Sequence, residues 1–183
     1  SKRTLDFSKA NHTQYSSPGL LFQRYDFKEL SVKLVLRYTT NRTALVETQI
    51  LNHMDQPLTL KLSWQGKLLS QWDDEKSVIE ALPHWSRKLV SDPQGVSIHF
   101  SETRLPWHIL TSKTSQYQIK RSIKTSTQIE QSNHSYISEK EVLIEANNIF
   151  SMFTTQSYFH DESEKNKENL AIEKMLLKPA QYI

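Results

Sequence analysis

The chain has 183 residues, the length of one ordinary domain, and it contains no cysteine, which excludes disulfide frameworks, thiolate catalysis and cysteine-ligated metal sites. Its 23 basic and 20 acidic residues nearly balance and are interleaved, so we expect no nucleic-acid partner. Apolar runs are only a few residues long, so we also expect no membrane-spanning segment.

Alternation of apolar and polar residues, the pattern of a half-buried β-strand, first appears in residues 32–38. One predicted face of this strand is apolar and carries Val32, Leu34, Leu36 and Tyr38, whereas the opposite face carries Lys33, Val35 and Arg37. Residues 44–50 repeat the alternation after a short polar stretch that contains Asn41. The two runs therefore predict a β-hairpin.

Further strand-like runs follow at residues 58–64, 96–100, 117–120, 142–145 and 150–154. We expect the run at 58–64 to end at Gln65-Gly66 and to resume at residues 67–69, and the run at 96–100 to follow a turn at residues 92–95. Strands of a buried parallel sheet would be continuously apolar instead of alternating. The pattern thus predicts an all-β fold, an antiparallel β-sandwich.

The C-terminal region differs, because residues 161–178 have the features of an α-helix. Asp161 or Ser163 can cap its start, and Pro179 ends it. Its predicted apolar stripe consists of Leu170, Ala171, Met175 and Leu176. We therefore expect a β-sandwich over residues 1–160, and over residues 161–183 a helix that leads toward a linker.

No arrangement of residues in the sequence predicts catalysis. The seven histidines show no metal-ligand spacing, so we expect no metal site and no cofactor; His99 and His108 are the one pair that could meet across strands. The densest acidic cluster is Asp73-Asp74-Glu75. A glycosidase needs two carboxyl groups roughly 5–10 Å apart on opposite sides of a sugar bond, and adjacent acids in a polar loop indicate a solvated turn instead.

The four tryptophans divide into two pairs. Trp64 is in phase with Leu58, Leu60 and Leu62 and is predicted to lie in the core, and Trp107, beside Pro106, is interpreted in the same way. Trp72 and Trp85 occur in polar, turn-rich sequence. Because an exposed aromatic ring can stack on a sugar, these two are the candidate sugar-stacking residues.

Four sequence landmarks together resemble the N-terminal domain of bacterial family 63 glycoside hydrolases. Residues 31–48, SVKLVLRYTTNRTALVET, resemble a hairpin of that domain, and residues 62–69, LSWQGKLL, resemble the next strand pair. Residues 107–112, WHILTS, with 115–118, SQYQ, are similar to a third landmark, and residues 176–182, LLKPAQY, to the segment before the linker. Their shared order carries the resemblance, which covers almost the whole chain.

The resemblance implies a sandwich of the super-sandwich type followed by a catalytic (α/α)6 barrel, in an α-glucosidase that works with inversion. It also implies that the barrel and the first strands of the sandwich lie outside this sequence, so no catalytic residue is carried over. The expected partner is the barrel of the same parent chain, in a bacterial protein that is periplasmic or secreted. An oligosaccharide is a further candidate partner, and Trp72 and Trp85 are the residues expected to stack on it.

Two other functions stay open at this point: a freestanding carbohydrate-binding module and a surface or adhesion domain. A binding module needs a line of exposed aromatic residues, whereas a packing domain needs an exposed apolar patch. A sandwich without its partner should also expose strand edges, so we expect the isolated chain to form a homodimer. In that dimer, residues 161–183 would dock on the neighbouring molecule.

Overall fold

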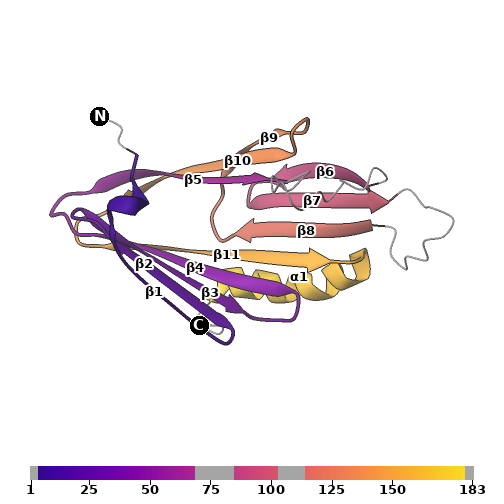
Figure 1. Ribbon diagram of the computed structural model, residues 1–183, viewed down its shortest axis with the longest axis horizontal. Coiled ribbons are helices and arrows are strands. Elements are labelled where there is room, and N and C mark those ends of the chain that lie inside the picture. Colours follow the sequence, from indigo (N-terminus) through magenta and orange to yellow (C-terminus); the bar gives the residue numbers. More distant parts are fainter. Residues whose placement is uncertain (1–3, 69–84, 103–113, 180–183) are drawn as a thin grey trace, which may run out of the picture.

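The computed structural model describes residues 4–68, 85–102 and 114–179, which form two antiparallel β-sheets and one long helix (Figure 1). The all-β antiparallel sandwich with a C-terminal helix is thus confirmed. In chain order the elements are the 3-10 helix η1 (Phe7–Lys9), β1 (Asn11–Ser17), β2 (Leu20–Asp26), β3 (Leu30–Tyr38), β4 (Thr43–Asn52), β5 (Leu58–Lys67), β6 (Trp85–Asp92), β7 (Gly95–Glu102), β8 (Thr114–Arg121), β9 (Ser126–Glu130), β10 (Ser135–Ile144), β11 (Ile149–Phe159) and α1 (Glu162–Leu177).

The larger sheet has eight strands in the order β1-β2-β3-β4-β11-β8-β7-β6, and the smaller has three in the order β5-β10-β9. The predicted hairpin is the β3–β4 pair, in which Val32 lies opposite Ile50. The predicted turn at residues 92–95 joins β6 to β7. Figure 1 shows the smaller sheet along one side of the larger one, with α1 on the other side.

Two hydrophobic clusters fill the space between the sheets. The first joins β3 and β4 to β10 through Leu30, Val32, Ile50, Val142 and Ile144. The second joins β6, β7 and β8 to β10 through Leu89, Val96, Ile98, Ile119 and Tyr136. We call the face of the larger sheet that carries these residues the inner face and the opposite one the outer face; alternate residues of each strand belong to each.

The outer face, which carries Lys33, Val35 and Arg37, is also buried in part, so these strands are covered on more than the single face that a half-buried strand would have. The helix α1 packs on this face, where Ile172 and Leu176 contact Phe153 and Phe159. On the same face Val35 is only 3% exposed and Leu45 only 1%. The alternation of residues 32–38 therefore marks an apolar inner face, but the outer face is covered as well.

The helix begins and ends close to its predicted limits, but its buried stripe is different. The side chain of Asp161 accepts a hydrogen bond from the Glu164 N–H at 2.9 Å and caps the helix as expected. The buried residues are Ile172, Met175 and Leu176, whereas Leu170 is 67% exposed. Positions spaced by three or four share a helix face, and Leu170, two residues before Ile172, points away from it.

Gly66 lies inside β5, where the sequence suggested a break. It pairs with Tyr136 of β10, and a Cβ atom at Gly66 would come within 2.3 Å of the Tyr136 ring. A glycine inside a strand often marks such a close approach. The strand therefore continues through Gly66, because this residue leaves room for an aromatic ring.

Candidate functional site

The residues that could support catalysis do not assemble into a site in the described part of the chain. No group of three histidine or acidic side chains that could hold a metal ion occurs there. His99 is described and His108 lies outside the described residues, as do Asp73, Asp74 and Glu75. Burial lowers the pKa of His99, and Lys165 of α1 contributes to the same direction.

The candidate sugar-stacking residues stay a prediction. Trp72, like Trp107, lies outside the described residues. Trp85 is the first residue of β6, but its side chain is not described. Sugar stacking at Trp72 and Trp85 is therefore a prediction from the sequence alone.

Trp64 lies on the inward side of β5, as its phase predicted, but it packs on a cation and is only half-buried. The Arg121 guanidinium carbon lies 4.7 Å from the centre of the Trp64 ring. Such a contact is worth up to about 2 kcal/mol when it is desolvated. Trp64 comes after Leu62, which packs on the first hydrophobic cluster, and before Leu68, which follows β5 and packs on the second. The contact between Trp64 and Arg121 therefore lies between the two clusters.

Arg121 is a buried cation without a carboxylate partner among the described residues. Its side chain is 1% exposed, and its Nε and Nη1 atoms have no hydrogen-bond acceptor there. Burial lowers the pKa of the guanidinium, and a hydrogen bond with the Tyr136 side chain opposes this effect. Among the described residues, the Trp64 ring and the Tyr136 hydroxyl are the groups that compensate the buried charge.

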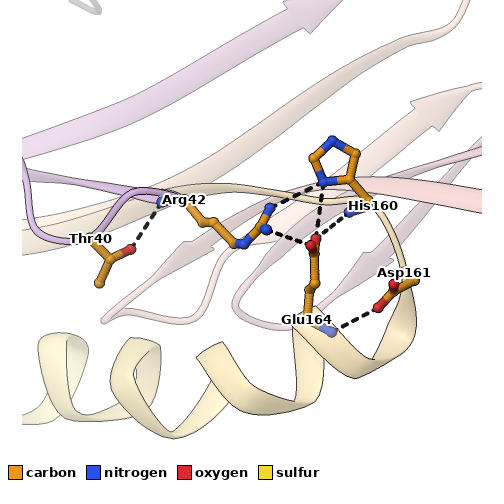
Figure 2. Close-up of polar contacts among 5 residues, drawn as sticks. All are labelled: Thr40, Arg42, His160, Asp161 and Glu164. Atoms are coloured by element: carbon orange, nitrogen blue, oxygen red, sulfur yellow. Dashed lines mark hydrogen bonds and ion pairs between the residues drawn. The ribbon is translucent and has the colours of Figure 1, made fainter. Parts of the chain in front are cut away.

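A polar cluster fixes the first half of α1 to the β3–β4 turn and the end of β11 (Figure 2). The Arg42 guanidinium donates to the Glu164 carboxylate, and the backbone N–H of His160 donates to the same carboxylate at 2.8 Å. The Nδ1 atom of His160 lies 3.2 Å from Arg42 Nη1 and 3.1 Å from Glu164 Oε2, so it can accept from one or donate to the other. One turn further along, Glu168 accepts from the Thr43 hydroxyl at 2.9 Å.

This cluster has the geometry of a helix attachment, and we expect its carboxylate to make the docking of α1 dependent on pH. The backbone N–H of His160 is the largest cause that holds the pKa of Glu164 below its ordinary value of 4.5, and the His160 side chain and Arg42 add to it. A carboxyl group with a lowered pKa in the folded state stabilises that state above its unfolded pKa, and the contribution is lost as pH falls through the lowered value.

We therefore expect Glu164→Gln to lower the melting temperature at pH 7 and to match the unmodified chain in acid, below the lowered pKa. Melting curves of both proteins between pH 7 and pH 3 test this. Glu173→Gln, at an exposed position of the same helix, serves as the control and should change little across the range. If Glu164→Gln lowers the melting temperature at pH 7 by no more than Glu173→Gln does, the Glu164 carboxylate does not fix the helix.

One part of the inner face lies beyond the two hydrophobic clusters. Leu21, Leu36 and Val46 lie side by side across β2, β3 and β4, and Tyr38 follows Leu36 on the same face. Tyr38 is 70% exposed, and Leu21 and Tyr158 are about two-fifths exposed. We call this surface the open inner face; its residues are Leu21, Leu36, Tyr38, Val46 and Tyr158.

On the open inner face Leu21, Tyr38 and Tyr158 are exposed, and Leu36 and Val46 are partly buried. The outward side of the smaller sheet is mostly polar by contrast. Its two exposed apolar side chains, Ile137 and Leu143, are separated by Glu139 and Glu141, and Lys61 pairs with Glu139 at 2.8 Å. No described residue on that side is aromatic. An apolar patch of this kind is typical of a surface that packs against another protein part.

The fold is that of a β-sandwich domain with an apolar patch on one sheet, and comparison with known proteins identifies its family. The model of the family described as "Glucosidase YgjK, N-terminal" matches residues 1–183, so the chain belongs to that family. It is therefore a domain of the kind found at the N-terminus of a glucosidase, in agreement with the resemblance of the sequence landmarks.

One solved structure supports the fold. A human-microbiome protein described as a candidate kojibiose phosphorylase is 15% identical, with a TM-score of 0.53 over 98% of this chain. This chain spans 24% of the length of that protein. An Escherichia coli K12 protein described as a candidate aldose 1-epimerase is 10% identical, with a TM-score of 0.48 over 80% of this chain and 68% of its own. The long helix α1 is not long and apolar enough to cross a membrane, and neither is any other helix in the described residues.

Proposed function

We propose that the domain packs through its open inner face against the catalytic (α/α)6 barrel of a longer bacterial parent enzyme. In this proposal the parent is periplasmic or secreted and hydrolyses α-glucosidic bonds with inversion. The observation that carries the docking is the exposure of Tyr38, Leu21 and Tyr158 on one part of a sheet that no other described element covers. The family supports the catalytic partner, because its name places this domain at the N-terminus of a glucosidase.

The chemistry would reside in the barrel. Inversion needs a general acid and a general base that are separated widely enough for a water molecule to lie between them. The described residues supply no such pair on the open inner face, whose members are apolar or tyrosine. The domain would therefore act by holding the barrel, and at most by bordering the cleft that binds the oligosaccharide.

Lysine substitution on the open inner face tests the docking. In the isolated chain Tyr38→Lys should leave the melting temperature nearly unchanged, because Tyr38 is 70% exposed. In the intact parent the same change would bury an unpaired ammonium group, which costs several kcal/mol, so melting temperature and glucoside hydrolysis should both fall.

Leu143→Lys is a matched control, because Leu143 is 60% exposed on the outward side of the smaller sheet. This variant should resemble the unmodified parent. If Tyr38→Lys and Leu143→Lys have equal effects in the parent, the open inner face does not dock the barrel.

A further inference from the structure

The edges of the two sheets differ in how well they are protected against pairing with another strand. In the part of the chain that the structure describes, β1 and β6 end the larger sheet and β5 and β9 end the smaller one. An edge strand presents unpaired backbone N–H and C=O groups, and natural proteins usually protect it with charges, proline, a bulge or a short length.

Three of these four edges carry such protection. Strand β5 contains Lys61 and Lys67, and β9 is only five residues long and ends at Glu130. Strand β6 contains Arg87 and Lys88. In addition, the N–H of Leu89 donates to the side-chain oxygen of Gln131, and the side-chain nitrogen of Gln131 donates to the C=O of Leu89. These backbone groups at the centre of β6 are therefore already paired.

Strand β1 has none of these features. Its seven residues, NHTQYSS, include no acidic or basic residue apart from one histidine, and no proline, and all seven are exposed. It pairs with β2 residue for residue, from Asn11 opposite Asp26 to Ser17 opposite Leu20, so no bulge interrupts it. The edge is anchored from behind, because Tyr15 stacks on Phe22 of β2 with ring centres 4.7 Å apart.

We propose that the β1 edge is an interaction surface that pairs, antiparallel and about a twofold axis at Gln14, with β1 of a second copy of this chain. Antiparallel alignment on this central residue uses all seven residues and places Gln14 opposite Gln14 and Thr13 opposite Tyr15. No like charges meet in that alignment, so the strand is complementary to itself. The result is one sheet that continues through both molecules, the isologous arrangement that is commonest among oligomers.

The β1 edge differs from the open inner face and from the dimer contact through residues 161–183 that the sequence suggested. The open inner face lies on a sheet face, whereas the β1 edge offers backbone hydrogen bonds. The helix α1 packs on the outer face of its own chain, so the pairing does not need residues 161–183. The proposal therefore stands or falls independently of docking to a catalytic barrel.

Charge substitution at the axis tests the pairing, because each change appears twice in the dimer. Light scattering on the unmodified chain should give twice its monomer mass of 21.4 kDa. Gln14→Lys alone and Gln14→Glu alone should each give monomers at the same concentration, since two like charges would face one another. An equal mixture of the two variants should give dimers again. Ser151→Lys, at an exposed position of the interior strand β11, is the charge control and should stay dimeric.

The variants should melt at the temperature of the unmodified monomer, because Gln14 is exposed, and melting curves will show that a loss of dimer is not a loss of folding. The proposal is overturned if the unmodified chain is monomeric at high concentration. It is equally overturned if either single variant remains dimeric, or if the mixture of the two stays monomeric.

Discussion

Replacing Trp64 with alanine should lower the free energy of unfolding by about 3 kcal/mol, the lower end for loss of a large aromatic side chain, because the ring is half-buried. The change removes an inward-facing side chain between the two hydrophobic clusters. It also removes the ring that lies 4.7 Å from the Arg121 guanidinium carbon, so a buried cation loses a group that compensates its charge. Urea unfolding monitored by circular dichroism measures the loss.

A double-mutant cycle separates the two contributions. Arg121→Met keeps the length of the side chain without its charge, and the change should be neutral or stabilising, because the buried cation has no carboxylate partner in the described residues. In that background the cost of Trp64→Ala should be smaller by about 1–2 kcal/mol, the value of a desolvated cation–π contact. Equal costs in the two backgrounds would show that the ring and the guanidinium act independently.

Replacing Asn52 with alanine should cost about 2–3 kcal/mol, because it leaves buried backbone groups without hydrogen-bond partners. Asn52 is fully buried at the end of β4. Its side-chain amide donates to the carbonyls of Gln56, Ile144 and Glu145 at 2.8–3.2 Å, and its side-chain oxygen accepts from the Met54 N–H at 2.9 Å. One side chain thus joins the turn after β4 to the end of β10, and so links the two sheets.

The isosteric variant Asn52→Asp provides a sharper form of this prediction. An ionised carboxylate cannot donate and would face the three carbonyl oxygens, so this change should cost more than Asn52→Ala at pH 7. Chemical denaturation measures both, with Asn41→Ala in the exposed β3–β4 turn as the control. A cost below about 0.5 kcal/mol for both Asn52 variants, the range of ordinary surface substitutions, would contradict this role.

Sequence patterns predicted the hairpin of β3 and β4 because one of its faces is consistently apolar. They did not predict β1, since NHTQYSS contains a single large apolar side chain and shows no alternation. That strand forms because the turn at Pro18-Gly19 returns the chain onto β2; Gly19 has a φ of 79°, which suits the third position of a type II turn. Backbone pairing, which side-chain patterns do not record, determines this strand.

The open inner face was predictable only in part. The alternation of residues 32–38 correctly placed Tyr38 on the same face as Val32, but it could not show that the smaller sheet covers Val32 and leaves Tyr38 70% exposed. The extent of that cover depends on where β5 and β10 cross the larger sheet, which is a long-range property. The stacking of Trp64 on Arg121 has the same origin, because the two residues lie 57 positions apart in the sequence and meet only across the two sheets.

Hydrolysis of aryl α-glucosides by this chain and by its intact parent is the most direct test of the central claim, that the chain is a noncatalytic domain of a glucosidase. We expect no turnover above background by residues 1–183 and clear turnover by the parent, with inversion at the anomeric carbon when the product is followed by nuclear magnetic resonance. Turnover by residues 1–183 alone that disappears in Asp73→Asn or Asp74→Asn would contradict it.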